Sequence, residues 1–195
     1  MIHVPSITAL SVVALTIGLA APAMAQQVQD VTLLGSADRL CALSAPELGV
    51  GPLENFSVPS GSVYSVEQLA DPTTLTTRAA RMTLSMDAMC NGVHRLIISS
   101  ENSGLWRRGA PTSSSGFGTG VPYRLNLAWA DENPSLTADA SIRQAREWLI
   151  LVGRPNAGAI ELEFEIDAGA TNAGTGAPMV AGRYADVLTL TVESQ

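Results

Sequence analysis

Lysine is absent from this chain: its eleven basic residues are all arginines, they face 18 acidic residues, and the formal net charge is −7. Affinity for nucleic acid rests on many Lys or Arg contacts to phosphates, so an acidic, lysine-free chain is a poor nucleic-acid binder. The same shortage of positive charge disfavours attraction to anionic membrane surfaces. We therefore expect no nucleic-acid partner and no membrane-surface partner.

Histidine is also scarce, with two in the whole chain. Catalysis needs titratable groups that converge in one pocket, and a serine triad here would have to use His94 as its base. Asp131, Glu132 and Glu101 form another conceivable set of acids. Adjacent acids before Asn133-Pro134 are more simply a turn. We predict that the protein is not an enzyme and has no catalytic residue, no cofactor and no metal.

Long apolar runs are missing, except for residues 7–21 near the start of the chain. Pro22 and the small-residue site Ala23-Met24-Ala25 follow this run, which is the layout of a cleavable secretory signal. About 15 apolar residues fall short of the roughly 20 that a membrane-spanning helix needs. We expect residues 1–25 to be a signal peptide, the exported protein to begin at Gln26, and no stable membrane insertion.

Only two cysteines are present, Cys41 and Cys90. In an oxidising compartment, one intramolecular disulfide is the simplest interpretation. Closing a loop of about 50 residues would contribute roughly 4 kcal/mol in the chain-entropy model. A metal site would need more ligands than these two thiols and His94, and a catalytic thiol would need a base.

Short apolar stretches separated by Thr, Ser and Gly predict an all-β chain of about 170 residues after export, which is the size of one domain. The clearest strand is 160–167, in which Ile160, Leu162, Phe164 and Ile166 alternate with acidic residues. This period of two indicates a half-buried strand with its acids in water. A cation site is less favoured, because carboxylates along one strand do not converge on one ion.

Further strands are expected at 81–90, at 95–99 after the Asn91-Gly92 turn signal, and at 182–192. Residues 107–120 and 167–178 are expected to be loops. The glycines at 116, 118 and 120 lack the strand and helix context of a phosphate-binding loop. Residues 137–148 fit either a short helix or an irregular β connection, before a buried strand at 149–152.

Several landmarks occur in the order of a known family. The most specific landmark is the closing run from Gly182-Arg183-Tyr184-Ala185-Asp186 to Val192. A second is Cys41 with the turn that ends at Leu48-Gly49-Val50-Gly51. The others are the strands around Cys90 and the run from Pro122 to Leu127. In these features the chain resembles the spore coat protein U domain family, which includes pilin-like subunits of archaic chaperone-usher pili.

The resemblance implies an incomplete immunoglobulin-like β-sandwich in residues 41–195, completed by a donor strand. It also implies a periplasmic chaperone, an outer-membrane usher, sibling or identical subunits as partners, and a path through the periplasm to a surface fibre involved in adhesion and biofilm. In this family the donor segment precedes the first cysteine, here in residues 26–40. The expected groove-inserting residues are Val31, Leu33, Gly35 and Ala37, and the expected acceptor and chaperone contacts are Tyr184, Leu188, Leu190 and Val192.

Three alternatives remain open at this stage. Residues 31–40 can be the first strand of the domain itself instead of a donor. The protein can be a secreted binding module or tip adhesin that displays Trp106, Trp129 and Trp148 to a carbohydrate or a surface. A protective coat would use the same self-associating sandwich as a pilus.

Overall fold

The computed structural model of the protein describes residues 32–109 and 115–195, so the predicted signal peptide lies outside the described residues. The chain divides into two units, Met1–Ser36 and Ala37–Gln195, and every described strand lies in the second. The described residues form fourteen strands and no helix, which confirms the predicted all-β class. Accordingly, none of their segments is a helix that could cross a membrane.

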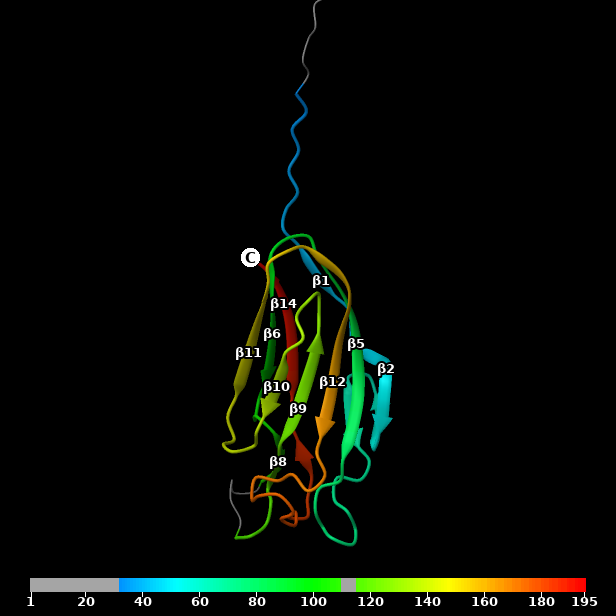
Figure 1. Cartoon of the computed structure of the whole chain (residues 1–195), viewed down its shortest axis with the longest axis vertical. Helices are drawn as coiled ribbons and strands as arrows, with labels where there is room; N and C mark the ends of the chain where they lie inside the picture. Colours follow the sequence, from blue (N-terminus) through cyan, green and yellow to red (C-terminus); the bar gives the residue numbers. More distant parts are fainter. Residues whose placement is uncertain (1–31, 110–114) are drawn as a thin grey trace, which may run out of the picture. The chain divides into compact units, whose positions relative to one another are not determined.

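The larger sheet has the strand order β1-β5-β12-β9-β10, with β2 also paired to β5. The smaller sheet has the order β11-β6-β14, and Figure 1 shows these three strands as a second layer behind the first. All ladders between named strands are antiparallel. The strands of these two sheets are β1 (Cys41–Leu43), β2 (Glu47–Glu54), β5 (Ala80–Cys90), β6 (His94–Ser100), β9 (Tyr123–Ala128), β10 (Ser135–Ala138), β11 (Arg146–Val152), β12 (Asn156–Ile166) and β14 (Leu188–Ser194).

Two small sheets complete the fold. One has the order β13-β7-β8, and the other is a pair of strands, β3 and β4. Their bounds are β3 (Phe56–Ser60), β4 (Val63–Val66), β7 (Leu105–Arg107), β8 (Gly120–Val121) and β13 (Tyr184–Ala185).

One apolar core lies between the two large sheets. The alternating residues of β12 point into it, and Ile160, Leu162, Phe164 and Ile166 are all buried, as the sequence pattern predicts. Leu96 and Ile98 of β6 belong to the same core cluster from the other sheet. The domain is therefore a β-sandwich, in agreement with the predicted fold class.

The strands on either side of Asn91-Gly92 lie in different sheets. The first strand, β5, pairs with β1, β2 and β12, whereas the second, β6, pairs with β11 and β14. The turn therefore carries the chain from one layer to the other and does not close a hairpin. The predicted disulfide is present at this end of the sandwich, where Cys41 of β1 is directly opposite Cys90 of β5.

The helical alternative for residues 137–148 is wrong, and the irregular β connection is right. Residues up to Ala138 belong to β10, and β11 begins at Arg146. Ala138 and Ala140 are both fully buried, and Ala140 has a positive φ of 52°, which ends the extended run. Asp139 accepts hydrogen bonds from the amide and hydroxyl of Ser141, so the local side chain stabilises a turn and not a helical cap.

The two predicted loops are confirmed where they are described. Residues 108–109 and 115–119 connect β7 to β8, and residues 167–183 connect β12 to β13. Close packing explains one glycine in the first loop and one at the start of β8. A Cβ on Gly118 would lie 2.5 Å from that of Thr171, and one on Gly120 would lie 3.2 Å from the Trp106 ring.

Candidate acceptor groove

The last strand of the sandwich has one unpaired edge. β14 pairs along its whole length with β6, from Leu188 opposite Ser100 to Ser194 opposite His94. No described strand forms a ladder with its other edge. The three-residue strand β1 lies near β14 but does not pair with it. Unpaired backbone N–H and C=O groups on such an edge favour the addition of another extended chain.

A groove with a volume of about 1140 Å³ opens beside this edge. One wall is the continuous segment 182–190, and residues 62–67 with Leu69 contribute on the other side. The floor consists of core side chains from both layers, among them Met82, Leu84 and Met86 of β5 and Phe164 of β12. We refer to this feature as the acceptor groove.

The four C-terminal residues that the resemblance assigns to partner contacts fall on one face of the chain. Tyr184, Leu188 and Leu190 line the acceptor groove, while Val192 continues the same face beyond the lining residues. All four are half-buried and pack against the core. An apolar occupant of the groove would therefore remove further apolar surface of these residues from water.

The predicted single strand at 182–192 is interrupted, because the chain leaves the β13-β7 ladder after Ala185 and joins β6 at Leu188. Asp186 lies at this break. Its carboxylate accepts hydrogen bonds from the hydroxyls of Tyr123 and Ser100, both at 2.6 Å. It also accepts from the side-chain amide of Asn102 and from the backbone amides of Asn102, Gly104 and Val187.

This carboxylate is a structural centre, because its acceptor positions are taken by groups from three segments of the chain. Burial and the nearby Asp186 charge raise the pKa of Tyr123, which keeps its hydroxyl protonated as a donor. Burial also raises the pKa of Tyr184, whose hydroxyl lies 2.7 Å from the Val180 carbonyl oxygen. The wall of the acceptor groove is therefore held in a fixed position at both Tyr184 and Asp186.

Nothing in the described N-terminal stretch forms a strand. Residues 32–40 are all exposed, and Leu33 retains 90 % of its accessible surface. The alternative in which residues 31–40 form the domain's own first strand is therefore wrong for the described residues 32–40. Gly35 and Ala37 are exposed as well, and Val31 lies outside the described residues. The donor assignment of these four residues stays a prediction.

Sequence reasoning missed the wall formed by β4 and the residues after it. Tyr64, Val66 and Leu69 are half-buried there and pack against the core, and Tyr64 also contributes a hydroxyl near the Pro46 carbonyl oxygen at 3.3 Å. The alternation of Val63-Tyr64-Ser65-Val66 after Gly61 is the signal that would have predicted this hairpin.

The tryptophans are mostly unavailable to a ligand. Trp106 and Trp129 are 2 % and 1 % exposed, and the indole N–H of Trp106 donates to the Asn102 carbonyl oxygen. Trp148 is half-buried, with the Arg146 guanidinium 5.5 Å from its ring centre. None of the three is an exposed aromatic platform of the kind that the binding-module alternative needs.

His94 is fully buried and engaged at both ring nitrogens. Its Nε2 accepts a hydrogen bond from the indole N–H of Trp129 at 2.9 Å, and its Nδ1 lies 3.0 Å from the Gly92 carbonyl oxygen. A serine triad that uses His94 as an accessible base is therefore incompatible with this geometry.

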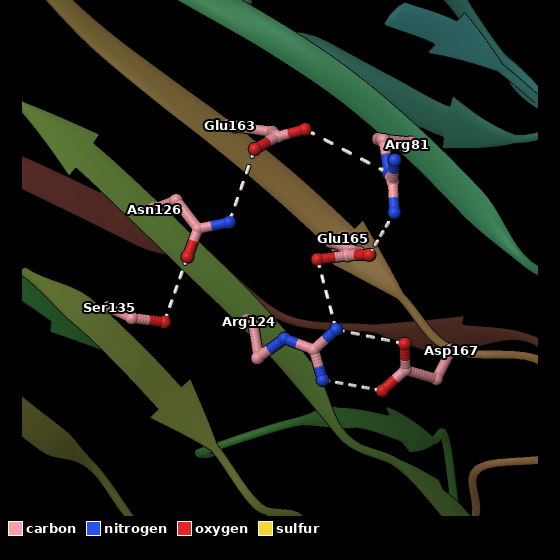
Figure 2. A network of polar contacts seen from close by, with 7 residues as sticks. All are labelled: Arg81, Arg124, Asn126, Ser135, Glu163, Glu165 and Asp167. Atoms are coloured by element: carbon pink, nitrogen blue, oxygen red, sulfur yellow. Dashed lines mark hydrogen bonds and ion pairs between the residues drawn. The ribbon is translucent and has the colours of Figure 1, made fainter.

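The acidic row of β12 lies on the outer face of the larger sheet, where arginines on the two neighbouring strands pair with Glu163, Glu165 and Asp167 (Figure 2). Arg124 of β9 binds Asp167 through both terminal nitrogens, at 2.6 and 2.9 Å, and Glu165 at 3.0 Å. Arg81 of β5 pairs with Glu165 and Glu163. The described residues contain no cluster of three or more side chains suited to hold a metal ion. The row is thus an ion-paired strand face.

The sequence matches no protein-family model and no curated protein. Among solved structures, the chain is similar to the CooA pilin subunit from enterotoxigenic Escherichia coli, at 13 % identity and a TM-score of 0.30. The match covers 74 % of this chain and 91 % of the pilin chain. The acceptor groove, and not this likeness, is therefore the basis for assigning a function.

Proposed function

We propose that this protein is a non-enzymatic structural subunit of a surface fibre, in which an N-terminal donor segment of one copy occupies the acceptor groove of the next. The acceptor groove is the observation that supports this most directly. It combines an unpaired strand edge with an apolar lining, and an inserted strand would satisfy both at once.

The N-terminal segment has properties that suit the donor role. Leu33 and Leu34 are adjacent, large and almost fully exposed, at 90 % and 92 %. Residues 32–40 form no strand that would compete with insertion. Because the donor and the groove are different surfaces, the contact is head-to-tail and propagates into a fibre instead of closing into a dimer.

The same reasoning requires a protecting partner before assembly. An exposed apolar groove and a free strand edge both promote aggregation. We propose that a periplasmic chaperone occupies the acceptor groove during export and that an outer-membrane usher exchanges it for the donor segment. On this proposal, residues 1–25 are the export signal, and the mature fibre lies on the cell surface as a pilus or a coat.

The test is co-expression of the exported protein with and without the periplasmic chaperone encoded nearest to it, followed by size-exclusion chromatography. We expect a soluble one-to-one complex with the chaperone, and polymers or aggregates without it. A stable monomer that needs no partner would contradict the proposed function and would favour the binding module.

A further inference from the structure

The guanidiniums of two arginines at one end of the acceptor groove have no hydrogen-bond or ion-pair partner among the described residues. The other nine guanidiniums each bond to a carboxylate, an amide oxygen or a backbone carbonyl. Arg108 and Arg183 are both exposed, and both line the groove. A hydrogen bond of 2.8 Å from the Arg108 amide to the Arg183 carbonyl oxygen holds their backbones side by side.

Two arginines on adjacent backbone positions whose guanidiniums lack a counter-charge favour the approach of a carboxylate from another molecule. Like charges repel, and an incoming acid relieves this repulsion while fixing the orientation of its own chain. Glu67 also lines the groove but has no ion pair with either arginine among the described residues. In this acidic protein, the end of the groove marked by Arg108 and Arg183 is therefore suited to an acidic residue of the occupant.

The donor segment contains an acid at a matching distance. Along the groove wall, every second side chain faces inward, and these are Leu190, Leu188, Asp186 and Tyr184. Arg183 is next to Tyr184 and lies seven residues before Leu190. In the donor segment, Val31, Leu33, Gly35 and Ala37 alternate in the same way, and Asp38 follows seven positions after Val31.

We propose that the donor segment runs antiparallel to residues 182–190 with Val31 opposite Leu190, which places the Asp38 carboxylate of one copy opposite Arg183 and beside Arg108 of the next. This inference rests on the proposed function. The antiparallel direction follows the pattern of every named ladder in the fold. Directly opposed residues on antiparallel strands have Cβ atoms about 5 Å apart, within reach of an ion pair.

The proposed pairing also matches the size of each donor side chain to the space beside the opposite residue of the groove wall. It places Leu33 opposite Leu188, and it places Gly35 opposite Asp186, where the carboxylate and the Tyr123 hydroxyl already fill the inward side. A shift of the register by two residues in either direction would separate Asp38 from Arg183, and in one direction it would also place Leu33 opposite Asp186. A slip of one residue would turn the apolar donor side chains outward.

Cysteine cross-linking tests the register directly. The full exported chain carrying Asp38→Cys and Arg183→Cys is assembled, oxidised and run on a non-reducing gel. We expect disulfide-linked ladders of two or more chains. The matched control combines Asp38→Cys with Thr189→Cys, since Thr189 lies six residues further along the same wall and should give no ladder. Ladders from the control pair alone would overturn the register.

Charge reversal tests the recognition. Asp38→Arg alone, or Arg108→Asp with Arg183→Asp, should each slow polymer formation about fivefold or more at low salt, measured by light scattering. Combining all three changes should restore the rate. Glu132→Arg, an exposed charge reversal in the turn between β9 and β10, should leave it unchanged.

The possible outcomes separate this inference from the proposed function. A slower rate of polymer formation in both charge-reversal variants, with recovery of the rate in the combined variant, supports the ion pair. Wild-type polymerisation in all charge variants, together with a block by Leu33→Arg, overturns the ion pair and leaves the proposed function intact. A slower rate in the charge-reversal variants that the combined variant does not restore also overturns the ion pair. Failure of the wild-type chain to polymerise overturns both.

Discussion

A single carboxylate organises the wall of the acceptor groove. Asp186 accepts hydrogen bonds from the end of β6, from the residues that follow it, and from β9. It lies where the chain passes from the β13-β7-β8 sheet to the β11-β6-β14 sheet. Hydrogen bonds to a charged group contribute more than those between neutral groups. The position of Tyr184 and Leu188 on the groove wall therefore depends on this residue between them.

Asp186→Asn tests this dependence. The asparagine has nearly the same shape, but it loses the charge and presents an N–H₂ group to neighbours that are themselves donors. We expect the free energy of unfolding to fall by about 2–3 kcal/mol, measured by urea denaturation. Asp131→Asn, which removes an exposed partner of Arg154, should cost under about 1 kcal/mol. Equal losses in the two variants would contradict a central role for Asp186.

The ion pairs on the outer face connect three strands of the larger sheet. Arg81, Glu165 and Arg124 lie on β5, β12 and β9, and Figure 2 shows Glu165 between the two guanidiniums. Hydrogen bonds from Arg124, supplemented by those from Arg81, hold the pKa of Glu165 below its ordinary value. The pairs therefore stabilise the folded state only while Glu165 is ionised.

The pH dependence follows from the sign of this shift. Because the folded-state pKa lies below the unfolded value of about 4.3, the stabilisation is fully present above that value and is lost as the pH falls through the folded-state pKa. We expect Glu165→Gln to lower the free energy of unfolding by about 1 kcal/mol at pH 7, with the difference from the wild type shrinking below about pH 4.

Denaturation curves of both proteins between pH 7 and pH 3 measure this difference. Glu147→Gln is the matched control, because Glu147 is exposed on β11 and has no ion pair among the described residues. A difference for Glu165→Gln that stays constant with pH would show that the loss comes from packing and not from charge.

At the level of elements, strands with a clear alternation of apolar and polar residues were predicted from the sequence. The alternation in β12 and in the last strand was sufficient to place them, since side chains on a strand point to opposite faces whatever the strand pairs with. The arginines that neutralise the acidic row could not be predicted, because pairing of β12 with β5 and β9 depends on the whole topology. The interruption at Asp186 was missed for the same reason, as its donors are 63 or more residues away for Tyr123 and Ser100.

The resemblance named some of the residues that line the acceptor groove, but not all of them. Tyr184, Leu188 and Leu190 line the acceptor groove, and their role as contacts of a partner stays a prediction. The opposite wall around Tyr64 and Val66 was not predicted, and neither were Arg108 and Arg183, because a groove forms only when distant segments meet. The membership of the spore coat protein U family stays a prediction.

At the scale of the whole molecule, the decisive property is that the sandwich has an open groove while residues 32–40 are exposed and form no strand. In the proposed fibre, each copy supplies to its neighbour the strand that it lacks itself. A change in the donor segment should therefore affect assembly without affecting the fold of the domain that carries it.

Leu33→Arg is the clearest test of this separation. Leu33 is exposed in the single chain, so the charge costs little there, whereas burial of an unpaired guanidinium in an apolar groove is heavily penalised. We expect polymerisation to fall at least about tenfold by size-exclusion chromatography, which corresponds to a loss of about 1.4 kcal/mol or more in the contact. The thermal unfolding of the chaperone-bound or monomeric protein should stay unchanged.

Leu34→Arg provides the matched control for that experiment. Leu34 is as large and as exposed as its neighbour, but in an extended chain it points to the opposite face. Polymerisation of this variant should remain close to that of the wild type if the donor inserts with Leu33 inward. If Leu34→Arg blocks assembly and Leu33→Arg does not, the inserted face is the other one. If both variants assemble normally, residues 26–40 are not the donor, and the strand that fills the acceptor groove comes from a different partner.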